Sequence, residues 1–157
     1  MYILSGDVGG TNSRLEISLL ENAEIKSIAI KKYKGADFCK FSDVIDKFLE
    51  DVNLVGKVDS VCLAIAGVVI NGEVEATNLP WLVSEQYIAD DLQIAVDRVK
   101  IINDFEAIGY GIEQLDRDKD LHTLQQGKHD ENAMSAVIGA GTGLGMCLVG
   151  YNNNQPM

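Results

Sequence analysis

The chain begins with an apolar run, Tyr2–Ser5, that leads directly into Gly6-Asp7-Val8-Gly9-Gly10-Thr11-Asn12. A short β-rich run that ends in an acid and two adjacent glycines is typical of a strand entering a tight turn. The two glycines let the backbone adopt positive φ and let a ligand approach where a Cβ would block it. Successive amides in such a turn can form a concavity that binds anions. The stretch therefore indicates either an ordinary hairpin turn or a phosphate-binding turn.

The polar side chains of this turn suit a nucleotide. Thr11 and Asn12 carry short groups that can hydrogen-bond a phosphate oxygen. Asp7 ends the strand, where a carboxylate can hold the Mg²⁺ of a nucleotide directly or through water. The turn is not a Walker A loop, and Gly127-Lys128, which is followed by His129, does not make one either.

The residues after the turn predict an antiparallel meander. Alternating polar and apolar residues predict strands over Arg14–Leu20 and Ile25–Tyr33, joined by a turn at Glu21–Glu24. Three strands in succession exclude a Rossmann fold, which needs a helix directly after its glycine turn.

Helices and strands then alternate, which predicts parallel crossovers and a mixed five-stranded sheet with helices, an α/β fold. The expected elements are a helix over Lys40–Val52, a strand buried on both faces over Val58–Ala66, a hairpin around Asn71-Gly72, a helix over Ser84–Ile94 with Ser84 as its N-cap, a strand over Val99–Ile102 and a helix over Phe105–Leu115.

A charged stretch, Asp116–Asp120, predicts a boundary between a first domain (1–115) and the beginning of a second (116–157). The second part repeats the opening pattern, with a strand over Ala133–Ile138, a glycine-rich turn over Gly139–Gly145 and a strand over Met146–Val149, before a loop at 152–156. This turn, taken alone, could be a flexible loop. Two similar turns, each opening its own domain, predict two similar halves that grip one nucleotide.

Asn103-Asp104 is the candidate catalytic pair. It follows a predicted parallel strand, and ligands of open α/β sheets bind at the carboxyl ends of such strands. Phosphoryl transfer to a hydroxyl needs one carboxylate to take the proton, which predicts Asp104 as general base and Asn103 as a sugar ligand. An Asn-Asp pair before a helix is also an ordinary cap, and the two roles are compatible.

Composition narrows the class of protein. The 157 residues carry a formal net charge of −11 and are 46% hydrophobic. We therefore expect a globular protein without a nucleic-acid or membrane surface. Three widely spaced cysteines and the absence of a leader pattern or an apolar run of about 18 residues predict a soluble, cytoplasmic protein.

Four motifs occur in order: Gly-Asp-Val-Gly-Gly-Thr-Asn-x-Arg (6–14), Thr-Asn-x-x-Trp (77–81), Ile-Asn-Asp-Phe (102–105) and Gly-Ala-Gly-Thr-Gly-Leu-Gly (139–145). With them the chain resembles the bacterial glucokinases, members of the sugar kinase, heat-shock and actin superfamily with ribonuclease H-like domains. The resemblance covers the whole chain. It implies phosphorylation of glucose at its 6-hydroxyl, with ATP and Mg²⁺.

The resemblance also implies roles for individual residues. Asp104 resembles the family's base and Asn103 a glucose ligand, with Asn78 lining the sugar pocket and Asp7 near Mg²⁺. The residues that resemble the family's ATP-binding segments are Gly6, Asp7, Val8, Gly9, Gly10, Thr11 and Asn12 in the first turn and Gly139, Gly141, Thr142 and Gly143 in the second.

The family continues beyond the second loop with a Glu-Gly-Gly-His segment and further sugar-binding glutamates, none of which lies within these 157 residues. We therefore expect an N-terminal portion that has no appreciable turnover alone. A kinase for another hexose or an N-acetylhexosamine, and a non-catalytic sugar sensor, remain alternatives; a filament-forming ATPase fits Asn103-Asp104 less well. A homodimer of the intact protein is left open.

Overall fold

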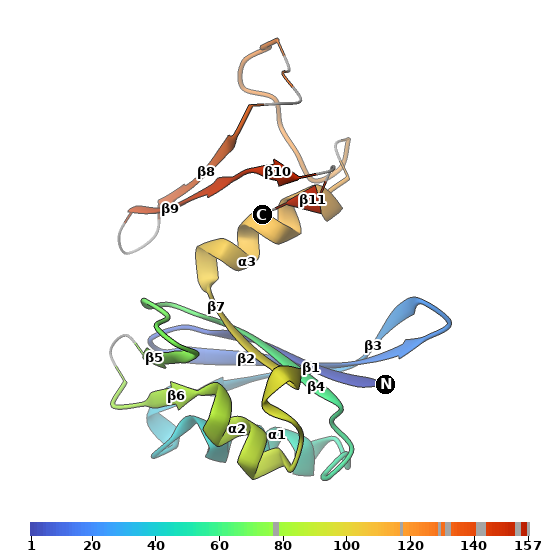
Figure 1. The fold of residues 1–157 in the computed structure, drawn as a ribbon, viewed down its shortest axis with the longest axis vertical. Coiled ribbons are helices and arrows are strands. Elements are labelled where there is room, and N and C mark those ends of the chain that lie inside the picture. Colours follow the sequence, from blue (N-terminus) through green and yellow to red (C-terminus); the bar gives the residue numbers. More distant parts are fainter. Residues whose placement is uncertain are drawn as a thin grey trace. The chain divides into compact units, whose positions relative to one another are not determined.

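The computed structural model describes residues 1–76, 79–116, 118–128, 130, 133–140, 144–152 and 155–156. It divides into two compact units, Met1–Asp104 and Phe105–Met157 (Figure 1). The division comes earlier than the boundary expected after residue 115. The helix expected to close the first domain begins at Asp104 and packs, through Phe105 and Gly109, on a hairpin of the second unit.

The first unit is built on a five-stranded sheet. Its strands are β1 (Tyr2–Val8), β2 (Asn12–Glu21), β3 (Glu24–Lys34), β4 (Ser60–Ile65) and β7 (Val99–Asn103), in the spatial order β3-β2-β1-β4-β7. The first three strands pair antiparallel, and β1, β4 and β7 pair parallel. The expected meander and mixed sheet are confirmed.

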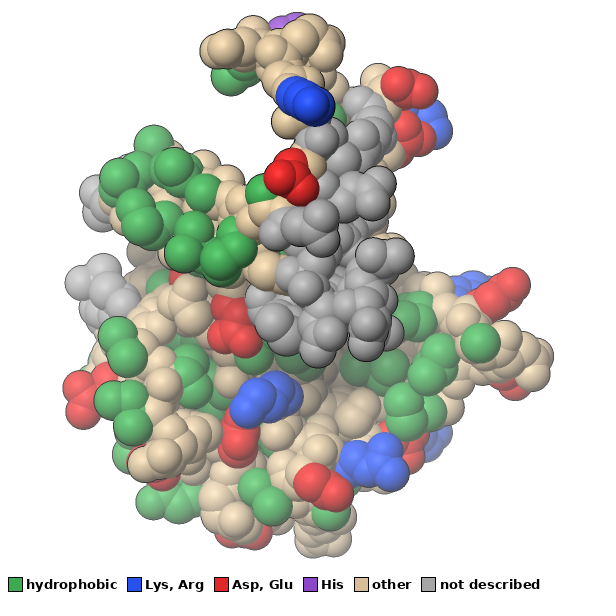
Figure 2. All heavy atoms as spheres, turned by 45° about the horizontal axis from the view of Figure 1, so that its top comes forward, with side chains coloured by type: hydrophobic (Ala, Val, Ile, Leu, Met, Phe, Trp, Pro, Cys, Tyr) green, Lys and Arg blue, Asp and Glu red, His purple; other side chains and the backbone are tan. Residues whose placement is uncertain are grey.

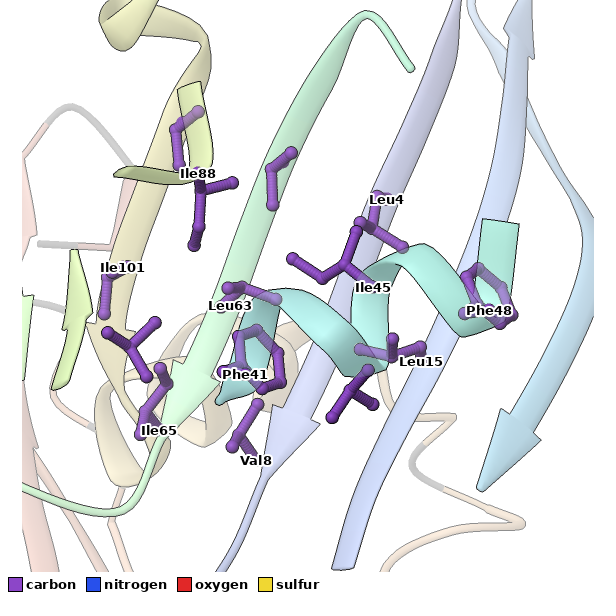
Figure 3. Close-up of a cluster of buried hydrophobic side chains, with 14 of the residues drawn as sticks. Leu4, Val8, Leu15, Phe41, Ile45, Phe48, Leu63, Ile65, Ile88 and Ile101 are labelled. Carbon is purple, nitrogen blue, oxygen red and sulfur yellow. The ribbon is translucent and has the colours of Figure 1, made fainter. Parts of the chain in front are cut away.

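Two helices, α1 (Phe41–Asp51) and α2 (Glu85–Leu92), cover one face of this sheet (Figure 1). The predicted apolar stripe of α1 is buried, and its aromatic side chains contact strand residues such as Leu4, Leu15 and Leu63 in one core (Figure 3). Each buried side chain of this size contributes about 1.5–3 kcal/mol. This layer therefore fixes the strands whose ends form the candidate site.

The expectation that the fourth strand is buried on both faces was wrong. Val61, Leu63 and Ile65 are buried, but the intervening Cys62 is exposed. Both α1 and α2 pack on the face that carries the buried residues, so the strand has the period-2 pattern of a half-buried strand.

The Asn71-Gly72 turn is confirmed, but the hairpin around it is minimal. Both residues have positive φ, 53° and 77°, as a type I′ turn requires. Outside the named strands only Ile70 and Glu73 form a bridge there. Strand β5 (Glu73–Glu75) pairs instead with β6 (Leu82–Ser84).

Ser84 precedes α2 as expected, but its side chain makes no capping hydrogen bond and is buried. The first backbone N–H of the helix, that of Glu85, donates to the carbonyl oxygen of Gly72 at 2.9 Å. The Asn71-Gly72 turn therefore satisfies the first amide of α2, whereas a serine cap would have accepted a hydrogen bond from the second or third.

The second unit contains α3 (Asp104–Gly111, shared at its first residue with the first unit) and an antiparallel hairpin of β8 (Ser135–Ala140) and β9 (Leu144–Val149). The two predicted strands are confirmed, but Gly139 and Ala140 belong to β8 and Leu144 and Gly145 to β9, although all four were expected in the turn. The loop expected at 152–156 was wrong in part, because β10 (Tyr151–Asn152) pairs with β11 (Gln155–Pro156). The short 3₁₀ helices are η1 (Gly35–Asp37), η2 (Val96–Arg98) and η3 (Ile112–Gln114). In the described part of the chain, no helix is both long and apolar enough to cross a membrane.

Candidate functional site

The glycine turn between β1 and β2 lines a surface hollow of about 660 Å³. Five of the seven residues singled out from the sequence reach it, together with cationic side chains of β2 and β3. The hollow is lined by Asp7, Gly9, Gly10, Thr11, Asn12, Arg14, Ile30, Lys31 and Lys32.

Backbone hydrogen bonds fix the shape of the turn. The N–H of Gly9 donates to the carbonyl oxygen of Asn12 at 3.0 Å, and the N–H of Gly35 donates to that of Thr11 at 2.9 Å. The amide of Gly9 is thus committed to the turn itself, although the sequence placed it among the amides facing an anion. The first of these bonds closes the turn and the second ties it to η1.

The other two residues of the stretch, Gly6 and Val8, face the core and do not line the hollow. A Cβ at Gly6 would lie 2.7 Å from Leu15 Cδ2 and 2.8 Å from Leu63 Cδ2, and Val8 is only 1% exposed. Since side chains alternate along β1, Asp7 points to the opposite face from both. Gly6 is therefore needed for close packing of β1 between β2 and β4.

Strand register brings cations to the turn that the sequence did not reveal. Arg14 is opposite Asp7 on β1 and opposite Lys32 on β3, so the three side chains share one face of the sheet. Arg14 and Lys32 are directly opposed like charges, an arrangement that costs stability unless an anion neutralises it. Lys31 points to the other face, where its ammonium lies 3.2 Å from Asp51.

Asn103 and Asp104 leave the sheet at the same edge as the glycine turn. Val8, Ile65 and Asn103 are aligned across β1, β4 and β7 at the carboxyl ends of the three parallel strands. Two strand spacings correspond to roughly 10 Å, so the turn and the Asn103-Asp104 pair lie close together at the carboxyl ends of the parallel strands. Asp104 is also the first residue of α3, so it begins the helix as the sequence allowed.

Two hydrogen bonds position this end of β7. The Asn103 Nδ2 group donates to the carbonyl oxygen of Gly67 at 2.9 Å. The backbone N–H of Ile101 donates to Glu85 Oε1 at 2.9 Å, and Lys100 Nζ lies 3.3 Å from the same carboxylate. Because β7 is at the edge of the sheet, Glu85 supplies the partner that a further strand would provide.

Several predicted site residues lie outside the described residues: Asn78, Gly141, Thr142 and Gly143. Gly139 is described, in β8 opposite Gly145 of β9. Among the residues whose positions are given, no group of three or more His, Cys, Asp and Glu side chains could hold a metal ion. Asp7 is the carboxylate among the residues that line the hollow of the glycine turn, and Mg²⁺ usually binds proteins through one or two carboxylates together with substrate phosphates and water.

Comparison with known proteins matches the chain to one family and to curated relatives of the same family. The glucokinase family matches residues 4–157. Glucokinases of Nostoc sp. and Trichormus variabilis are each 39% identical over 154 residues, which is 98% of this chain and 44% of each relative. The chain thus spans less than half the length of the curated relatives it matches.

Solved structures agree on the fold. A glucokinase from an Antarctic psychrotroph superposes with a TM-score of 0.77 at 30% identity, over 99% of this chain and 48% of that one. A glucokinase from Balamuthia mandrillaris in complex with glucose has a TM-score of 0.73 at 21% identity, over 99% and 46%. A ROK family glucokinase from Streptomyces griseus in complex with glucose and AMPPNP has a TM-score of 0.56 at 17% identity, over 100% and 46%. The expected sugar-kinase fold with an actin-like ATPase architecture is confirmed.

Proposed function

The chain belongs to the glucokinase family, and we propose that the protein carrying it transfers the γ-phosphoryl group of ATP to the 6-hydroxyl of glucose. The observation that carries the proposal is the alignment of Val8 and Asn103 at one edge of the sheet. In this alignment a glycine turn suited to phosphate and an Asn-Asp pair suited to a hydroxyl are separated by about two strand spacings. Phosphoryl transfer needs such juxtaposition more than it needs covalent chemistry from the protein.

Asp104 is the proposed base. Its carboxylate takes the proton of the 6-hydroxyl as that oxygen attacks the γ-phosphorus, and the bond to the β-phosphate oxygen breaks to release ADP. Asn103, whose amide nitrogen is oriented by Gly67, hydrogen-bonds a neighbouring sugar hydroxyl. We assign a role in lining the sugar pocket to Asn78.

The nucleotide is held by the first turn and, in this proposal, by the second. The amides of Gly10 and Thr11 and the side chains of Thr11 and Asn12 contact phosphate oxygens, with Arg14 and Lys32 adding positive charge. The loop from Gly139 to Gly143, including Gly141 and Thr142, acts as the second phosphate loop. Asp7 fits a role in holding Mg²⁺, which supplies charge neutralisation on the phosphates when bound.

A second set of functions uses the same fold. A kinase for another hexose or an N-acetylhexosamine would keep Asp104 and differ in substrate preference. A sugar sensor would bind a hexose without releasing ADP. Cytoplasmic ATP is the expected phosphoryl donor, and the exposed side chains of Cys39 and Cys62 suit that reducing compartment.

The test is ADP release by the gene product that contains this chain, with Mg²⁺-ATP and a panel of glucose, mannose and N-acetylated hexosamines. Glucose-dependent release is expected, falling by at least about 10³-fold in Asp104→Asn with little change in glucose affinity. Asp97→Asn, an exposed carboxylate of η2, is the matched control. Near-normal turnover of Asp104→Asn would contradict the base assignment, and sugar binding without release would favour the sensor. The 157-residue chain alone is expected to show no appreciable turnover.

A further inference from the structure

The ring of Phe105, the residue after Asp104, lies on a pair of glycines. Gly139 of β8 and Gly145 of β9 are directly opposite in the hairpin that bears the second glycine loop. A Cβ at Gly139 would lie 2.8 Å from Phe105 Cζ, and a Cβ at Gly145 would overlap the same ring. Carbon atoms in contact stay about 3.5–4.0 Å apart, so only glycine at both positions leaves room for the phenyl group.

In the next turn of α3 the small residue is on the helix and the larger residues are on the hairpin. Gly109 is four residues after Phe105 and so lies on the same face of the helix. A Cβ at Gly109 would be 3.1 Å from Val149 Cγ2 and 3.2 Å from Cys147 Sγ. The large residue of the helix thus meets the glycines of the hairpin, and the glycine of the helix meets its larger residues.

We propose that Phe105 is a positioning residue that fixes the axial position of α3, and thus of its first residue Asp104, on the hairpin of the second glycine loop. A shift of α3 by one turn, about 5.4 Å, would place the phenyl ring against Cys147 and Val149 and leave the glycine pair uncovered. One arrangement therefore packs far better than its neighbours. The kinetic consequence rests on the proposed function; the packing does not.

The kinetic test uses variants of the gene product in which the glycine of the contact is enlarged, the phenylalanine is made smaller, or both. Gly145→Ala should lower kcat for glucose phosphorylation about 10-fold or more while KM for glucose changes less than threefold. Phe105→Leu should lower kcat in the same way, and Gly145→Ala/Phe105→Leu should recover most of the loss of Gly145→Ala. Gly111→Ala is the control, because a Cβ there meets nothing within 4 Å. Additive losses in the double variant, or a Gly145→Ala enzyme equal to Gly111→Ala, would overturn the proposal.

A second readout is independent of activity. In the 157-residue chain with Cys39→Ser and Cys62→Ser, the remaining thiol, Cys147, reports the contact with Gly109. Its reaction with a disulfide reagent should be at least about fivefold faster in Gly145→Ala and return toward the parent rate in Gly145→Ala/Phe105→Leu. Equal rates in all three would overturn the positioning role. If the thiol responds but the parent gene product releases no ADP, the proposed function fails and the packing role stands.

Discussion

Lys32 is one of the cationic residues that line the hollow of the glycine turn. It lies opposite Arg14 in the hollow of the turn, in a chain whose formal net charge is −11. Lys32→Ala in the gene product should raise KM for ATP about 3- to 10-fold, the loss of roughly 1 kcal/mol of a partly exposed charge-assisted contact. Steady-state kinetics with ATP varied measure it. Lys26→Ala, on the same strand but away from the hollow, is the control and should leave KM for ATP unchanged.

Ala23 is held in a conformation that suits glycine. The turn between β2 and β3 consists of Asn22 and Ala23, with φ of 51° and 63°. Because a Cβ costs about 1 kcal/mol in this region, Ala23→Gly should raise the free energy of unfolding by about 0.5–1 kcal/mol. Urea denaturation measures the change. Ala29→Gly, within β3, is the control and should lower the free energy of unfolding instead. A loss of stability in Ala23→Gly would contradict the positive φ assigned to Ala23.

The sequence did not predict that Lys32 lies opposite Arg14, because strand β2 contains a β-bulge. The turn at Glu21–Glu24 was predicted correctly, and counting back from it along two regular strands places Lys31 opposite Arg14. A β-bulge between Ile17 and Ser18 shifts the register by one residue, so Lys32 takes that place. A one-residue shift moves every later side chain to the other face, which no composition pattern reveals. The positions of Asp7 and of Asn103-Asp104 at the ends of β1 and β7 were predictable, because the apolar runs before them mark the strands.

At the scale of elements, Asp51 at the end of α1 ties that helix to β3. Its carboxylate accepts hydrogen bonds from Lys47 Nζ at 2.6 Å and from the Tyr33 hydroxyl at 3.0 Å, and it lies 3.2 Å from Lys31 Nζ. These bonds, first that of Lys47, lower the pKa of Asp51 to about 2. Burial, together with the Asp51 contact, raises the pKa of Tyr33, which keeps its hydroxyl protonated as a donor.

This tether should make stability depend on pH in a defined direction. The pKa of Asp51 is lower in the folded chain than in the unfolded chain, so its contribution is present above about pH 4 and is lost as the pH falls toward 2. Asp51→Asn should therefore lower Tm at pH 7, and the difference should narrow between about pH 4 and pH 2. Thermal unfolding by circular dichroism measures it, with Asp97→Asn as control. A difference independent of pH would contradict the ionic origin of the tether.

Long elements were predictable from periodicity and short ones were not. The stripe of α1 over Phe41 to Leu49 extends over about two and a half turns, enough to identify the buried face. Strand β6 has three residues, Leu82–Ser84, too few to show a period, so its pairing with β5 was missed. Trp81, the residue before β6, is 2% exposed, and its ring is tilted against that of Phe41 with centroids 5.8 Å apart.

At the scale of the whole molecule, the two glycine-turn hairpins differ in how their apolar residues are covered. In the first unit the apolar side chains of β1 and β2 pack under α1. In the second unit α3 packs on one face of the β8–β9 hairpin, whereas a row of hydrophobic side chains on its other face is exposed (Figure 2). That row consists of Ile138, Leu144, Met146 and Leu148, each 63–67% exposed in the described part of the chain.

An exposed row of hydrophobic side chains of this kind tends to bind other apolar surfaces. The 157-residue chain should therefore bind the dye ANS and self-associate as its concentration rises. Met146→Lys/Leu148→Lys should reduce both without lowering Tm by more than about 2 °C, because the replaced side chains bury little area. Ile25→Lys, on β3 and 69% exposed, is the control for an added charge elsewhere. Dye fluorescence and light scattering measure the two effects. If the double variant bound the dye as strongly as the parent, the row on the β8–β9 hairpin would not be the surface that binds the dye.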